Sequence, residues 1–147
     1  MASSAAASVL QSRFPATDVG LNDALNAFDR WATAQAIDAS NQARLRLALE
    51  ELAINIVRHG GQAPDTGWFA IQIEILDSTI SMTVEDEGMA FDPTTHPAPD
   101  LDADLHSRVP GGLGISLVRS MMQRVSYRRV GDINQTTMVY PMQASDD

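Results

Sequence analysis

The chain has 147 residues, which is enough for one domain with a hydrophobic core but not for two. Its apolar fraction of 44%, charged fraction of 20% and net charge of −9 are typical of a soluble globular protein, and they argue against a surface that tracks nucleic acid or an anionic membrane. Cysteine and lysine are both absent, which excludes thiol catalysis, cysteine-ligated zinc, Schiff-base chemistry and the phosphate-binding lysine of P-loop proteins.

Residues 1–12 are small and polar without periodicity, so we expect a flexible N-terminal tail before a single domain over residues 13–143. The first ten residues lack the basic region of a signal peptide, and no apolar run has the length of a membrane-spanning helix. The sequence therefore predicts a cytoplasmic protein without direct contact to membranes or nucleic acid.

Two helices are predicted first. Thr17 or Asp18 can cap the first helix, and Ser40 or Asn41 can cap the second, which ends near His59-Gly60-Gly61. Each helix has an apolar stripe at helical spacing, formed by Leu21, Leu25, Phe28 and Trp31 in the first and by Leu45, Leu49, Leu52 and Ile56 in the second.

The second half of the chain predicts four strands and a third helix. Alternating apolar residues indicate strands over 68–76 and 80–84, with a turn at Asp77-Ser78. Residues 92–110 contain four prolines and little periodicity, which is typical of a functional lid. A helix follows residues 111–114, and short strands follow near 125–129 and 136–140. This order predicts an α/β two-layer sandwich, with helices on one face of a mainly antiparallel mixed sheet.

Three short segments contain residues suited to chemistry. On the second helix, Glu51, Asn55 and His59 share one face, although solvated surface residues explain this pattern about as well. At the end of a strand, the Asp86 carboxylate can accept from an amine in a pocket while Gly88 allows a flat ring to approach closely. An ordinary acidic turn is the alternative for this segment.

The third segment is Gly111-Gly112-Leu113-Gly114, which opens a helix. Glycines before a helix N-terminus expose N–H groups at the positive end of the dipole, where anions bind, but such glycines also form simple turns. Arg108 is the cation nearest to this segment in the sequence, and a solvated loop arginine is its alternative explanation.

Taken together and in this order, the three segments resemble the N, G1 and G2 boxes of the GHKL ATPases, which have the Bergerat fold. The flanking residues 47–60 and 112–119 are similar to the RsbW/SpoIIAB-type anti-sigma factor serine kinases, and the resemblance covers about residues 14–142. Gyrase-, chaperone- and MutL-type members need further domains, and sensor histidine kinases need a dimerisation helix, so we expect a stand-alone catalytic domain.

The resemblance implies a role for each matching residue. Asn55 corresponds to the asparagine that holds Mg²⁺ between the phosphates of ATP, and Glu51 to the proposed general base. Asp86 would accept from the adenine amine beside Gly88. Other nucleotide-binding residues implied by the resemblance are Arg108 in the lid, Gly112, Leu113 and Gly114 through their backbone, and Thr136 on a late strand.

The implied function is phosphorylation of a serine or threonine on a STAS-domain anti-sigma factor antagonist with Mg-ATP. A sigma factor is a second candidate partner, and assembly into a homodimer is left open. Two alternatives remain at this point: a nucleotide-gated regulator that binds its partner without significant kinase activity, and a small α/β protein that binds no nucleotide.

Overall fold

A computed structural model describes residues 8–95 and 112–142, with the side chains of residues 112 and 113 outside the description. In these ranges the chain forms five strands and three helices. In chain order they are β1 (Val9–Pro15), α2 (Asp18–Ala34), α3 (Ala39–His59), β2 (Trp68–Leu76), β3 (Thr79–Asp86), α4 (Gly112–Met121), β4 (Arg124–Val130) and β5 (Ile133–Pro141).

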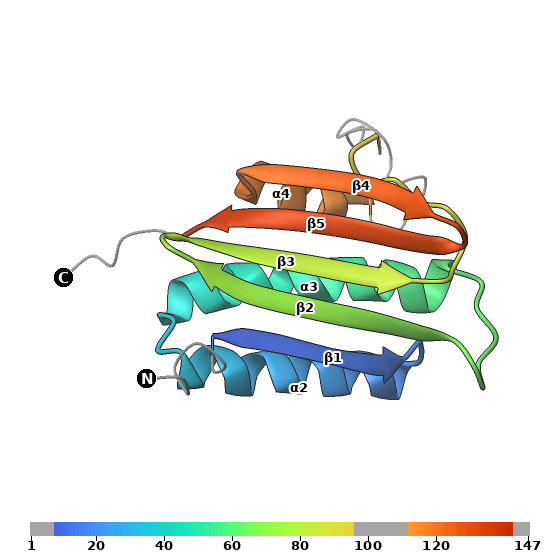
Figure 1. Ribbon diagram of the computed structural model, residues 1–147, viewed down its shortest axis with the longest axis horizontal. Helices are drawn as coiled ribbons and strands as arrows, with labels where there is room; N and C mark the ends of the chain where they lie inside the picture. The colour runs from blue at the N-terminus through green and yellow to red at the C-terminus, as the bar shows by residue number, and fades with distance from the viewer. Residues whose placement is uncertain (1–7, 96–111, 143–147) are drawn as a thin grey trace.

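The five strands form one sheet in the order β1-β2-β3-β5-β4. Each neighbouring pair is antiparallel, so the expectation of a mixed sheet is wrong for the described strands. Figure 1 shows all three helices on the same face of this sheet, with the other face uncovered by any labelled element. The predicted α/β two-layer sandwich is therefore confirmed.

The predicted tail overlaps a strand, because β1 begins at Val9 and pairs along its whole length with β2. The domain therefore starts before residue 13, while residues 1–7 lie outside the described part of the chain. β1 is at the edge of the sheet and its inward positions alternate weakly: Phe14 is buried, but Ser12 is polar and half-buried. An apolar alternation strong enough to predict a strand is therefore missing.

The first two predicted helices both form, and their caps explain where they begin. Thr17 caps α2, since its hydroxyl accepts from the backbone N–H of Gly20 at 3.1 Å. Asp38 caps α3, with its carboxylate 2.9 Å from the N–H of Asn41, so the expected caps Ser40 and Asn41 are wrong. Asn41 lies inside the first turn instead, where its buried side chain accepts from the hydroxyl of Tyr140 at 2.6 Å.

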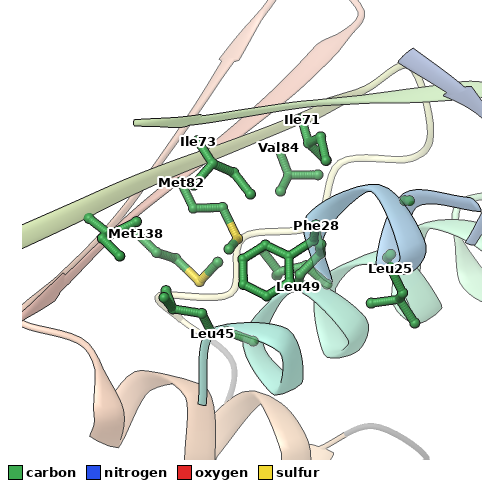
Figure 2. Packing of buried hydrophobic residues seen from close by; sticks show 14 of the residues in the cluster. Leu25, Phe28, Leu45, Leu49, Ile71, Ile73, Met82, Val84 and Met138 are labelled. Carbon is green, nitrogen blue, oxygen red and sulfur yellow. The ribbon is translucent and has the colours of Figure 1, made fainter. Parts of the chain in front are cut away.

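The core lies between the helices and the inner face of the sheet. Figure 2 shows Phe28 and Leu25 from α2 and Leu45 and Leu49 from α3 facing the strand residues. The strand residues labelled there are Ile71, Ile73, Met82, Val84 and Met138, all of which are buried. Removing these side chains from water supplies the main driving force for packing the two layers.

Polar residues replace apolar ones at one end of this inner face. Of the four buried polar residues of the described chain, Asp86, Asn134 and Thr136 lie here, whereas Asn41 pairs with Tyr140 at the other end of the β3–β5 ladder. Asp86 is the last residue of β3 and faces Asn134 across the β3–β5 pairing, and Thr136 is two residues further along β5. Since buried polar groups cost free energy unless they are paired, this cluster marks the candidate site.

Candidate functional site

A cavity of about 250 Å³ lies beside the buried polar cluster, between α3, the inner face of β3 and β5, and α4. Its apolar walls include Leu52, Ile56, Val84 and Ile115, whereas Asn55, Asp86, Asn134 and Thr136 supply polar atoms. Apolar walls with a few convergent polar groups are typical of a small-molecule site. Within the described part of the chain, the remaining lining residues are His59, Gly60, Met89, Ala90 and Phe91.

The carboxylate of Asp86 is held in place by hydrogen bonds to one of its two oxygens. Its Oδ1 atom accepts from the N–H of Gly88 at 2.7 Å and from Nδ2 of Asn134 at 3.1 Å. Burial raises the pKa of Asp86 above its ordinary value, and the hydrogen bonds from Asn134 and Gly88 and the charge of Arg129 oppose that rise. Since both bonds from described residues reach Oδ1, Oδ2 is the oxygen left to accept from a ligand.

Gly88 brings the loop after β3 against the end of α3. A side-chain carbon at this position would lie 2.8 Å from the carbonyl oxygen of Gly60 and 2.9 Å from Oδ1 of Asp86, so only glycine fits. The next residue extends this contact, because the N–H of Met89 donates to the same Gly60 carbonyl at 2.8 Å. Two segments that are far apart in the sequence are therefore joined at the cavity.

Asn55 presents a polar atom without a partner. It lies on α3 and lines the cavity, and its Nδ2 atom is buried without a hydrogen bond to any described residue. An unpaired buried amide costs roughly 1–3 kcal/mol, so a ligand in the cavity that accepts from Nδ2 would be stabilised by this side chain.

Glu51 lies one turn before Asn55, and its carboxylate is against the first turn of α4. A side-chain carbon built on Gly114 would be 2.1 Å from Oε2 of Glu51, which shows how closely the carboxylate approaches the helix backbone. The pKa of Glu51 is raised, mainly by burial and also by the negative charge of Glu50. A carboxylate with a raised pKa is a better proton acceptor, as a general base requires.

The chemistry of these groups fits an adenine nucleotide with Mg²⁺. Asp86 offers a carboxylate oxygen to an amine. Asn55 offers an amide oxygen to a cation, and its unpaired Nδ2 atom can donate to an anionic oxygen such as that of a phosphate. Among the described residues no three histidine or acidic side chains gather as a metal site of their own.

The structure brings most of the predicted site residues to one place. Asn55, Asp86 and Thr136 line the cavity, Gly88 adjoins it and Gly114 touches Glu51. The backbone of Gly112 and Leu113 forms the start of α4. Arg108 lies outside the described residues, as does most of the predicted lid, of which only residues 92–95 are described.

Asn134 is a site residue that the sequence did not predict. The available signal was its position two residues before the strand predicted over 136–140, with the same inward parity as Thr136. Met89 and Phe91 were also missed: both line the cavity, yet Met89 remains 66% exposed and Phe91 38% exposed. Exposed apolar side chains at a cavity are consistent with a surface that a ligand or partner covers.

Comparison with known proteins agrees with this geometry. A family model described as the histidine kinase-like ATPase domain matches residues 14–140. The chain is 30% identical over 110 residues to the serine/threonine-protein kinase BtrW of Bordetella bronchiseptica, a match that spans 75% of this chain and 73% of BtrW. It is also 30% identical over 92 residues to the serine-protein kinase RsbW of Staphylococcus aureus, where the match spans 58% of each chain.

A solved structure shows the same fold. The RsbU and RsbW domains of Rv1364c from Mycobacterium tuberculosis match with a TM-score of 0.67 at 15% identity, over 91% of this chain and 32% of that one. The described residues contain no helix that is long and apolar enough to cross a membrane. Since the family model covers most of the chain and includes every candidate site residue, the chain belongs to the histidine kinase-like ATPase domain family, in the group of BtrW and RsbW.

Proposed function

We propose that this protein is an ATP-dependent protein serine/threonine kinase that uses Mg²⁺ and phosphorylates a STAS-domain anti-sigma factor antagonist. The observation that carries the proposal is the convergence of the Asp86 carboxylate and the unpaired Asn55 amide on one cavity, with Glu51 one helical turn away. The names of BtrW and RsbW, both protein kinases, support the reaction class. The sequence resemblance supports the STAS-domain substrate and makes a sigma factor the second partner to test.

Asp86 would select the nucleotide base. Its Oδ2 atom would accept from the amine of adenine, and the apolar side chains of Val84 and Ile115 would contact the flat faces of the ring. A charge-assisted hydrogen bond of this kind contributes about 1.5–3 kcal/mol in a buried site. The close packing of Gly88 on Gly60 keeps that wall of the cavity free of side chains.

Asn55 and the first turn of α4 would hold the phosphate end. The Asn55 amide oxygen would be a ligand of Mg²⁺, and N–H groups at the start of α4 would donate to phosphate oxygens at the positive end of the helix dipole. When bound, Mg-ATP supplies the phosphoryl group and much of the charge neutralisation that a chain without lysine must obtain elsewhere.

Glu51 would act on the partner protein. A serine or threonine hydroxyl becomes a better nucleophile when a base takes its proton as the new bond forms. The half-buried Glu51 carboxylate has the raised pKa that this role favours, and it lies at the same helix start that would bind the phosphates. It would hold the transferred proton at one of its oxygens.

The proposal is tested by incubating the protein with Mg-ATP and with STAS-domain proteins from the same genome, and by mass spectrometry of the products. We expect one phosphoserine or phosphothreonine on a STAS domain. The Asp86→Asn variant should bind ATP about 10- to 100-fold more weakly in calorimetry.

Glu85→Gln is the matched control, since it makes the same chemical change one residue earlier, on the face of the sheet away from the helices, and it should bind ATP normally. Binding of ATP and a STAS domain without any transfer would instead support a nucleotide-gated regulator. Equal affinity of the Asp86→Asn variant for ATP would contradict the proposed adenine site.

A further inference from the structure

The hydrogen bonds of Asn134 link three strands and the loop after β3. Its Nδ2 atom is within 3.1 Å of Asp86 Oδ1, 3.2 Å of the Gly88 carbonyl oxygen and 2.9 Å of the Met89 carbonyl oxygen. Its Oδ1 atom accepts from the hydroxyl of Tyr127 at 2.5 Å and from Nη1 of Arg129 at 2.9 Å. The side chain is 4% exposed, so these contacts are made without competition from bulk water.

These partners leave the Asn134 amide only one orientation. A flipped amide would place its NH2 group against the Arg129 guanidinium and its oxygen against a carboxylate and two carbonyl oxygens, which is a mismatch at four of the five contacts; only the Tyr127 hydroxyl could adapt. Arg129 also donates to the Gly88 carbonyl at 3.1 Å and so ties the same loop to β4. The amide is therefore a fixed connector between β4, the loop and Asp86.

This connector determines which Asp86 oxygen is already paired and which is left for a ligand. Asp86 and Asn134 are direct partners across the β3–β5 ladder, so the Asn134 N–H approaches Asp86 from the side, along the sheet. Together with the N–H of Gly88, it engages Oδ1 and fixes the rotation of the carboxylate. Without it, the carboxylate could rotate, and the Gly88–Met89 segment would lose its main contact with β5.

We propose that Asn134 is a positioning and specificity-determining residue, which holds Asp86 Oδ2 toward the cavity and thereby enables recognition of a 6-amino purine. The proposal rests on the proposed ATP site but assigns a role that the N, G1 and G2 segments do not contain. Tyr127 and Arg129 support it by fixing the Asn134 oxygen.

The test compares the affinities for ATP and for purine riboside triphosphate, which lacks the 6-amino group, in calorimetry with Mg²⁺. The unaltered protein should prefer ATP by about 10- to 100-fold, the effect of one charge-assisted hydrogen bond. Asn134→Leu removes the donor at similar volume and should reduce this preference to less than about threefold. Gln135→Leu, one residue along on the opposite face of the sheet, is the matched control and should retain the preference.

A merely structural role for Asn134 would weaken both nucleotides equally, and an unchanged preference in Asn134→Leu would overturn the proposal. Where circular dichroism shows that Asn134→Leu does not fold, Tyr127→Phe decides instead. That variant removes one donor from a half-buried residue and should lower the preference about two- to fivefold. If it retains the full preference, the proposal is wrong.

Two further outcomes separate this inference from the proposed function. An unaltered protein that binds neither nucleotide overturns both of them. A preference that is lost in Asp86→Asn but retained in Asn134→Leu overturns the role of Asn134 alone.

Discussion

Replacing Gly114 by alanine should separate stability from catalysis. The new side-chain carbon would lie 2.1 Å from Oε2 and 2.2 Å from Cδ of Glu51, distances that real contacts do not reach. The carboxylate is the far end of a flexible side chain, so it can retreat by about 1 Å while the backbone stays in place. Since alanine is favoured over glycine within helices by up to about 1 kcal/mol, the melting temperature should stay level or rise.

Catalysis should suffer from the same displacement. A shift of about 1 Å in a positioned catalytic group can cost about 100-fold in rate. We therefore expect single-turnover transfer from Mg-ATP to the partner to fall by roughly this factor in Gly114→Ala. The assay pairs rapid-quench measurement of the transfer rate with thermal denaturation of the same preparation.

A double-mutant cycle identifies Glu51 as the cause of the loss. In a Glu51→Gln background, the alanine at position 114 should have little further effect on transfer, because the displaced group no longer acts as a base. Parental transfer by Gly114→Ala, or losses that multiply independently in the double variant, would refute the reasoning.

Three further predictions concern charge and burial. The rate of phosphoryl transfer should fall as the pH is lowered through the raised pKa of Glu51. The midpoint of the pH–rate profile should lie above 4.5, the ordinary pKa of a glutamate, and a midpoint at or below 4.5 would contradict a base role. Burial raises the pKa of Asp86, so its charged form lowers the stability of the fold at pH values above that pKa. Asp86→Asn should therefore melt at a higher temperature than the unaltered protein at neutral pH, and a lower melting temperature would contradict this prediction. Tyr140→Phe removes the donor to the buried Asn41 and should cost about 1–3 kcal/mol in urea denaturation; no loss would mean that this bond is not needed.

Strong periodicity made most of the fold predictable. The bounds of β2 follow from its alternating isoleucines, and the turn at Asp77-Ser78 was found where Asp77 adopts a positive φ of 56°. β1 could not be found in this way, since an edge strand buries few side chains and needs little apolar alternation. The cap of α3 was misplaced because Asp38, Ser40 and Asn41 are all good capping residues, and only the backbone path shows that Asp38 is the cap.

The candidate site was predictable where it has local motifs. Asn55 and Asp86 were found from short segments with fixed spacing, and the structure places both at the cavity. Asn134 has no local motif, because its role depends on a partner in another strand, 48 residues away along the chain. Pairing between strands is set by the tertiary fold, so it could not be derived from spacing alone.

The most direct test of the kinase account compares ATP affinity and single-turnover transfer in Glu51→Gln and Asn55→Ala. Glu51→Gln should keep its affinity for Mg-ATP and lose about 10²- to 10⁴-fold in transfer, the usual contribution of a general base. Asn55→Ala should lose both, because its amide is the proposed metal ligand. Glu85→Gln, which makes the same chemical change on the face of the sheet away from the helices, is the control and should transfer at the parental rate. Transfer by Glu51→Gln at the parental rate would contradict the account.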